Sequence, residues 1–123
     1  MHFRAVRVAD DGDGAKGRLT RMALDELSPG EVVVRVAHSS LNYKDALAVT
    51  GRGRIMRRLP LNAGIDLSGV VEGSTDSALS PGTEVIANGM GLGELHDGGF
   101  AEYARLPAAW LMPLPKGLTL RSA

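Results

Sequence analysis

The chain has 123 residues, of which 44% are hydrophobic, and its 14 Lys and Arg residues balance its 14 Asp and Glu residues. This length favours one domain that buries roughly two thirds of the surface exposed by the unfolded chain. The formal net charge of zero gives no global electrostatic basis for binding nucleic acid or a membrane surface. The absence of cysteine excludes disulfides, thiolate zinc sites and a cysteine nucleophile.

The N-terminal sequence lacks the uninterrupted apolar segment of a signal peptide, and no apolar run approaches the ~20 residues that span a bilayer. We therefore expect a cytoplasmic protein without nucleic-acid or membrane partners. The 16 glycines follow no repeat period. Together with short valine-rich runs, they indicate short strands joined by tight turns.

About seven strands are expected, in chain order. They cover residues 3–8, 17–24, 31–40, 67–73, 83–87, 100–106 and 110–114. Residues 17–24 also fit one helical turn, so both alternatives stay open there. Residues 31–40 carry β-branched valines at successive positions, which implies burial on both faces. The pattern therefore predicts an all-β barrel or sandwich.

One short helix is predicted over residues 43–50, where Ala-Leu-Ala occurs without Gly or Pro. Asn42 stands at the N-cap position, and Asp45 stands at the third helical position, where a carboxylate favours the positive helix end. Gly51 closes this helix. Residues 88–99 hold five glycines and are expected to be irregular.

A second helix is expected to begin at the end of the sequence. Thr119 fits an N-cap, but residues 120–123 supply only about one turn, which cannot sustain itself. We therefore expect residues 1–118 to form one domain, with residues 119–123 starting a linker or helix into a further domain.

Four segments point to a family by their order and spacing. They are SSLNYKDALAVTG, LPLNAGIDLSGVV, PGTEVIANG and GGFAEYARLPAAWLMPLP. With them, residues 3–118 resemble the catalytic domain of medium-chain dehydrogenases/reductases. Within this superfamily the chain is most similar to the zinc-free quinone oxidoreductase branch, and there to the acryloyl-CoA reductase (YhdH-type) subgroup.

The resemblance implies a GroES-like, partly open barrel with one or two short helices. It also implies a following Rossmann domain, with NADPH bound between the two domains and a homodimer for the full-length protein. The chain has no strand followed by GxGxxG with an acidic residue ~20 positions later, as dinucleotide binding needs. The nearest match, residues 89–93, is expected to be a loop.

Zinc-dependent members of the superfamily hold the catalytic metal with Cys, His and Glu ligands. By the resemblance, the matching positions are Asn42, Ile65 and Asp66. Zinc takes three or four nitrogen, sulfur or charged oxygen ligands, and Ile65 cannot supply one. The three histidines share no ligand spacing, so we expect no metal site.

Without a Lewis acid, the resemblance implies reduction of the activated C=C bond of a small enoyl-CoA such as acryloyl-CoA. Hydride from NADPH would add to the β-carbon while charge builds on the thioester oxygen. The protein must then supply donors where this charge develops and hold the two reactants together.

The candidate catalytic residues are Asn42, Tyr43 and Asp45, and the candidate cofactor-binding residues are Asn42, Tyr43 and Lys44. The Asn42 amide could position cofactor or substrate, or serve only as an N-cap. Tyr43 could donate its hydroxyl or stack on the nicotinamide, or lie in the core. Asp45 could orient one of these groups, or only complement the helix terminus. Asp66 is either a structural hydrogen-bond acceptor or part of the substrate site.

The segment after the helix is a local concentration of positive charge. Its cations are Arg52, Arg54, Arg57 and Arg58, and Lys44 lies just before it in the helix. It is either a solvated loop or a phosphate clamp for CoA or NADPH, because guanidinium groups match phosphate oxygens. If the segment is a phosphate clamp, Arg52, Arg57 and Arg58 bind the substrate.

Two alternatives to the enoyl-CoA reductase remain. One is a quinone or enone reductase of the same family. The other is a non-catalytic GroES-like binding module, which the barrel fold alone cannot exclude.

Overall fold

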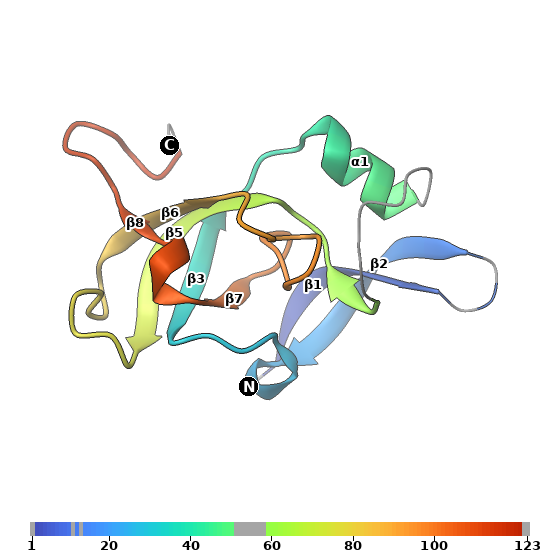
Figure 1. The fold of residues 1–123 in the computed structure, drawn as a ribbon, viewed down its shortest axis with the longest axis horizontal. Helices are drawn as coiled ribbons and strands as arrows, with labels where there is room; N and C mark the ends of the chain where they lie inside the picture. Colours follow the sequence, from blue (N-terminus) through green and yellow to red (C-terminus); the bar gives the residue numbers. More distant parts are fainter. Residues whose placement is uncertain (1, 11, 13, 51–58, 122–123) are drawn as a thin grey trace.

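The computed structural model describes residues 2–10, 12, 14–50 and 59–121 (Figure 1). The strands are β1 (His2–Asp10), β2 (Ala15–Ala23), β3 (Val32–His38), β4 (Leu61–Asn62), β5 (Asp66–Ser74), β6 (Glu84–Asn88), β7 (Tyr103–Leu106) and β8 (Met112–Pro113). The helices are the 3-10 turn η1 (Leu24–Glu26), the α-helix α1 (Tyr43–Thr50) and the 3-10 turn η2 (Ala108–Trp110). None of the helices in these ranges is long and apolar enough to cross a membrane.

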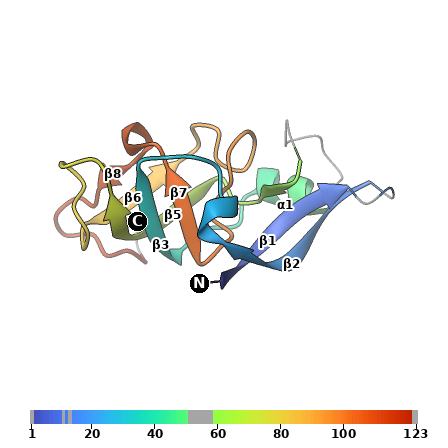
Figure 2. The ribbon, with the colours of Figure 1, turned by 90° about the horizontal axis from the view of Figure 1, so that it is seen from below.

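The strands form two antiparallel sheets, ordered β2-β1-β4 and β7-β3-β5-β6-β8. β1 joins them: Ala5 forms a bridge with Ala101, and the Val6 N–H donates to the Phe100 carbonyl at 2.7 Å. Figure 2 shows the β1–β2 hairpin on one side of the molecule and the five-stranded sheet on the other. The predicted all-β class is confirmed.

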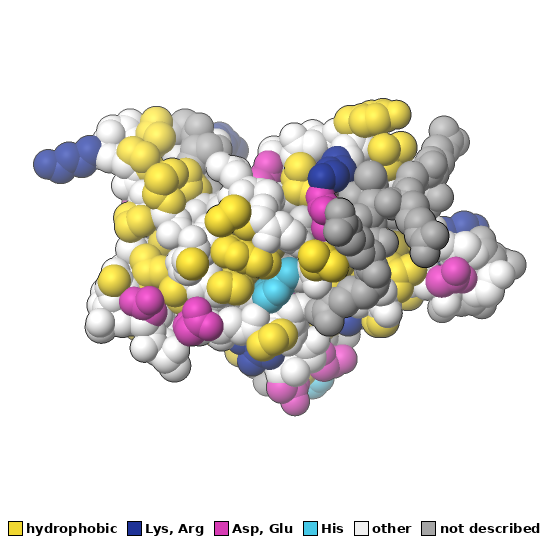
Figure 3. Space-filling model, viewed as in Figure 1, with side chains coloured by type: hydrophobic (Ala, Val, Ile, Leu, Met, Phe, Trp, Pro, Cys, Tyr) yellow, Lys and Arg dark blue, Asp and Glu magenta, His cyan; other side chains and the backbone are white. Residues whose placement is uncertain are grey.

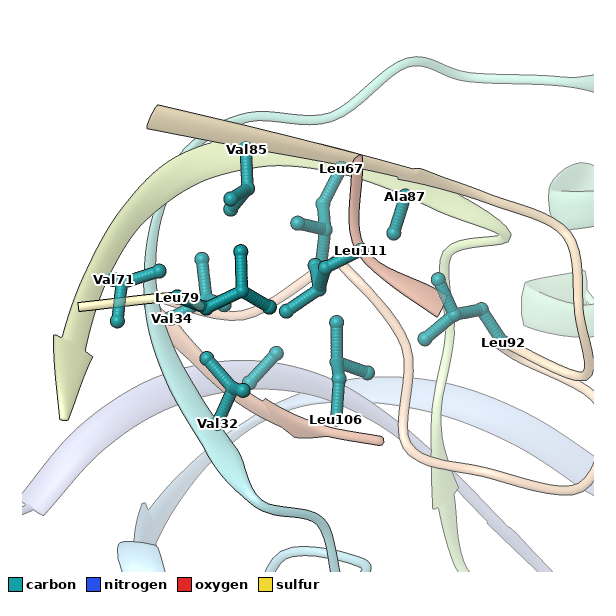
Figure 4. Close-up of a cluster of buried hydrophobic side chains, with 11 residues drawn as sticks. Val32, Val34, Leu67, Val71, Leu79, Val85, Ala87, Leu92, Leu106 and Leu111 are labelled. Atoms are coloured by element: carbon teal, nitrogen blue, oxygen red, sulfur yellow. The ribbon is translucent and has the colours of Figure 1, made fainter. Parts of the chain in front are cut away.

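The main core lies inside the five-stranded sheet. Figure 4 shows its side chains pointing from several strands into one shared space. They are Val32, Val34, Leu67, Val71, Leu79, Val85, Ala87, Leu92, Ala104, Leu106 and Leu111. In β3, Val32 and Val34 are fully buried, whereas Val33 and Val36 are half-buried. Complete burial of β3 is therefore limited to one face, and the predicted burial on both faces is only partial.

A smaller apolar cluster anchors α1. Ala48 of the helix is buried with Val8 and Leu61, and Val49 packs against them. The helix lies over the β1–β2 hairpin (Figure 1). This contact fixes the direction in which α1 runs away from the end of β3.

Most predicted elements are present, with five differences. Residues 17–23 belong to β2 and Leu24 begins the 3-10 turn η1, so the helical alternative for this segment is wrong. The strand predicted at 100–106 begins only at Tyr103, and before it Phe100 and Glu102 hydrogen-bond to Val6 and Arg4 of β1. Residues 110–114 contain the end of η2 and then the two-residue β8, and the two-residue β4 was not predicted. The described part of residues 119–123 contains a turn and no helix.

The segment after β6, residues 89–99, is here called the glycine loop. It packs closely against the chain that precedes β5. The Gly98 N–H donates to the Asn62 carbonyl at 3.0 Å, and the Gly99 N–H donates to the Gly64 carbonyl at 3.1 Å. A Cβ atom at Gly98 would lie 2.0 Å from the Gly64 carbonyl oxygen. Only glycine permits the two backbones to approach so closely, and this packing places the glycine loop beside the start of β5.

Candidate functional site

The start of α1 is tied to the start of β5 by Asp45. The Asn42 carbonyl accepts the first helical hydrogen bond, from the Ala46 N–H at 3.1 Å. Asp45, at the third helical position, turns back and accepts from the Asn42 N–H at 3.0 Å through Oδ2, which is one half of a capping box. Its Oδ1 accepts from the Ile65 N–H at 3.0 Å. Asp45 is 1% exposed, so it is a buried carboxylate whose two oxygens hold two segments together.

The side chain of Asn42 is a donor, not a helix cap. Its Nδ2 lies 3.2 Å from Asp45 Oδ2, 3.2 Å from Asp66 Oδ2 and 3.4 Å from Ser40 Oγ. Asn42 therefore occupies the N-cap position by its backbone, while its amide joins two acidic side chains. The N-cap role expected for the side chain is wrong.

Asp66 is the first residue of β5 and is half-buried. Its Oδ1 accepts from the Ser40 N–H at 3.1 Å, and its Oδ2 accepts from the Ser40 hydroxyl at 2.7 Å. Asp66 is thus a hydrogen-bonded acceptor, as one alternative predicted, and it also lies directly beside Asn42. Its place in a substrate site stays a prediction. A small pocket beside Asp66 is lined by His38, Ser39, Ser40, Leu67, Ser68, Ile86, Asn88 and Arg121.

Tyr43, the first residue of α1, is 81% exposed, so the alternative that places it in the core is wrong. Leu41, just before it, is 75% exposed. Hydrophobic side chains also appear on the molecular face that carries α1 (Figure 3), and Met90 and Leu95 of the glycine loop are exposed. Apolar groups beside a few fixed polar atoms are typical of ligand sites.

Lys44, predicted to bind the cofactor, forms an ion pair with Glu94 of the glycine loop. Its side chain is 46% exposed, and that of Glu94 is 22% exposed. An anionic ligand would therefore have to compete with Glu94 for this ammonium group.

The predicted arginine clamp of Arg52, Arg54, Arg57 and Arg58 lies outside the described residues. Within the part of the chain that is described, no three His, Asp or Glu side chains lie close enough together to hold a metal ion. At the three positions matched to zinc ligands, Asn42 and Asp66 are hydrogen-bonded to each other and Ile65 offers only an aliphatic side chain.

Sequence reasoning missed Ser40, Glu94 and a second polar cluster around Asp97, which is 2% exposed. Asp97 accepts from Arg7 Nη1 at 3.0 Å, from the Ser28 N–H at 2.8 Å and from the Asn62 N–H at 2.8 Å. These contacts tie the glycine loop to β1, to β4 and to the turn after η1. The Asp-Gly-Gly sequence predicts only a turn. The partners of Asp97 lie 35 to 90 positions away, so no local signal identifies Asp97 as a buried acceptor.

Comparison with known proteins places this chain in a family. Residues 28–116 match the alcohol dehydrogenase GroES-like domain. The chain belongs to this family. The expected GroES-like fold and the resemblance to medium-chain dehydrogenases/reductases are confirmed.

Three relatives illustrate the match. AcuI of Escherichia coli K12, named a probable acrylyl-CoA reductase, is 51% identical over 102 residues, which are 81% of this chain and 32% of that protein. YhfP of Bacillus subtilis, whose name describes a quinone oxidoreductase, is 40% identical over 121 residues, 98% of this chain and 37% of that protein. The crystal structure of the yhdH oxidoreductase from Salmonella enterica in complex with NADP is 42% identical, with a TM-score of 0.93 over 99% of this chain and 37% of that chain. This chain therefore spans about a third of the length of these relatives.

Proposed function

We propose that this chain is the catalytic domain of an NADPH-dependent reductase that acts on the activated C=C bond of a small enoyl-CoA such as acryloyl-CoA. The observation that carries the proposal is the Asn42–Asp66 hydrogen bond at two of the three positions matched to zinc ligands, with an aliphatic side chain at the third. This arrangement supports a reaction in which polarisation by zinc plays no part. The 51% identity to AcuI supports the enoyl-CoA substrate.

The residues at the site fit a nicotinamide cofactor. Tyr43 presents an exposed ring and hydroxyl, and Asn42 presents an amide held in place by its neighbours. NADPH, when bound, supplies the hydride for the β-carbon of the alkene. Asn42 and Tyr43 would orient the two reactants, and Asp45 and Asp66 would hold Asn42 in place.

The 123 residues are proposed to need a nucleotide-binding domain for activity, and the full-length protein is proposed to be a cytoplasmic homodimer. The arginines at positions 52, 57 and 58 are proposed to hold the phosphates of CoA. A chimera tests the activity: this chain replaces the matching part of E. coli AcuI, and NADPH oxidation is followed with acryloyl-CoA. We expect turnover by the chimera and little by the chain alone. Full activity of the chain alone would contradict the domain assignment, and an inactive but folded chimera would contradict the reaction.

A quinone or enone reductase is the second candidate, favoured by the 40% identity to YhfP. The same chimera assayed with a simple quinone separates the two, because the faster substrate identifies the reaction. For the third candidate, a GroES-like binding module, a ring-sized assembly of the chain in light scattering would be the supporting result.

A further inference from the structure

The amide of Asn42 can take only one orientation. Its Nδ2 faces two carboxylate oxygens at 3.2 Å, from Asp45 and Asp66, and the Ser40 hydroxyl oxygen at 3.4 Å. An amide carries two N–H donors at nitrogen and only acceptor capacity at oxygen. If the amide were turned by 180°, its oxygen would face two carboxylates and no donor would remain between them. The NH₂ group must therefore point inward.

The two carboxylates cannot turn away to permit the other orientation. Asp45 is held by the backbone N–H groups of Ile65 and Asn42, and Asp66 is held by the backbone N–H and hydroxyl of Ser40. In the described ranges, no Lys, Arg or His lies within ion-pair distance of either carboxylate. The Asn42 amide is therefore the side-chain donor that lies between the two negative charges.

We propose that Asp45 and Asp66 are positioning residues that make Asn42 present its carbonyl oxygen, Oδ1, to the ligand. No donor among the described residues reaches this oxygen, whereas both amide protons are engaged. The inference rests on the proposed function for the identity of the ligand. The group that Asn42 recognises is an N–H or O–H donor of the nicotinamide riboside part of the cofactor, either the carboxamide NH₂ or a ribose hydroxyl. Asn42 does not stabilise charge on the thioester oxygen, because such charge needs a donor.

The orientation can be tested on the 123-residue chain without any ligand. The sequence has three Asn and no Gln, so its NMR spectrum contains only three side-chain NH₂ pairs, from Asn42, Asn62 and Asn88. We expect the Asn42 protons to exchange with water more slowly than those of the exposed Asn88 and to shift in Asp66→Ala. The exposed Asp25→Ala serves as the matched control and should leave them unchanged. Asn42 protons that exchange like those of Asn88 would overturn the inference.

The acceptor role is tested with NADP⁺ and two analogues, each titrated into the chimera described above, with the Kd measured by calorimetry. One analogue carries 3-acetylpyridine and lacks the carboxamide NH₂, and the other lacks the 2′-hydroxyl of the nicotinamide ribose. One of them should bind roughly 5- to 10-fold more weakly than NADP⁺, which is the effect of one lost hydrogen bond. The analogue that loses affinity identifies the donor.

The variants then separate positioning from a structural role. In Asn42→Ala the affinity ratio between NADP⁺ and the weaker analogue should fall close to one. In Asp66→Ala the ratio should fall in part, and in Asp25→Ala it should stay as in the parent chimera. An unchanged ratio in Asn42→Ala would overturn the inference even if NADP⁺ binds. Failure of the folded chimera to bind any of the three ligands would overturn the proposed function and this ligand assignment together, and the ligand-free measurement would still decide the orientation.

Discussion

Lys44 forms an ion pair with Glu94, and this contact joins the first turn of α1 to the glycine loop. Both side chains are partly exposed, so the pair contributes about 1 kcal/mol or less to stability. Its position matters more than its strength. The carboxylate neutralises the cation that directly follows Asn42 and Tyr43 at the start of the helix.

Replacing Glu94 by Gln should strengthen the binding of an anionic cofactor. The freed ammonium of Lys44 no longer has a competing carboxylate, so we expect the Kd for NADPH in the chimera to fall about threefold. Calorimetric titration measures this Kd. Glu102→Gln is the matched control, because Glu102 is also paired with a cation, Arg4, but at β1. Equal affinities of the two variants would contradict a cofactor role for Lys44.

Charge reversal at Arg57 and Arg58 tests the proposed clamp. If these side chains hold the phosphates of CoA, glutamate at both positions should raise the KM of the chimera for a CoA thioester by at least about tenfold. The KM for the short pantetheine analogue, which lacks those phosphates, should change much less. Equal losses with both substrates would show that the arginines only form a solvated loop.

Asp97 should be among the residues most important for stability. Asp97→Ala leaves Arg7 and the N–H groups of Ser28 and Asn62 without their buried acceptor, so we expect a loss of about 3–5 kcal/mol in the free energy of unfolding. Urea denaturation of the 123-residue chain measures this loss. The exposed Asp25→Ala should change it by less than about 0.5 kcal/mol. A similar small effect in Asp97→Ala would show that the cluster contributes little.

Gly98→Ala should be strongly destabilising. The added Cβ would lie 2.0 Å from the Gly64 carbonyl oxygen, and this atom belongs to the backbone and cannot rotate away. We expect a loss of roughly 2–4 kcal/mol and displacement of the glycine loop. Gly73→Ala is the control, since a Cβ there meets nothing within 4 Å. Comparable urea midpoints for the two variants would rule out the close approach of the loop.

Stability should depend on pH through Glu102. Hydrogen bonds from the side chain and backbone N–H of Arg4 lower the pKa of Glu102 below its usual value of 4.5. The stabilisation is therefore fully present above the unfolded pKa and is lost as the pH falls through the folded pKa. Urea midpoints of the parent chain and Glu102→Gln should differ slightly at pH 6 and converge in acid. A difference that persists or grows in acid would contradict this linkage.

Local sequence was enough to predict most of the fold. The run without Gly or Pro at 43–50 predicts α1, and the successive valines at 32–34 predict β3, because both signals act between near neighbours. Strand ends were harder to predict: β7 begins only at Tyr103, and the preceding Phe100 and Glu102 hydrogen-bond to β1, in which Arg4 lies 98 positions from Glu102 in the sequence. The two-residue β4 has no pattern of its own and exists through pairing with β1.

The candidate site was predicted in part. Asn42, Asp45 and Asp66 were identified, and the structure brings them together. Their partners could not be predicted, since Ser40 lies 26 positions from Asp66 and Lys44 lies 50 positions from Glu94. Such contacts follow from the way the strands fold over one another. The direction of the Asn42 amide likewise depends on two acids from different elements.

The buried Asp45 has a consequence for how a ligand is received. Its two oxygens bind the backbone of Asn42 and of Ile65, so α1 and β5 cannot separate without removing the Ile65 N–H from a buried carboxylate oxygen. The polar end of the site is preorganised before any ligand arrives. Binding of the cofactor then costs little conformational entropy at Asn42, and more of the binding free energy is available to hold the nicotinamide ring in one orientation.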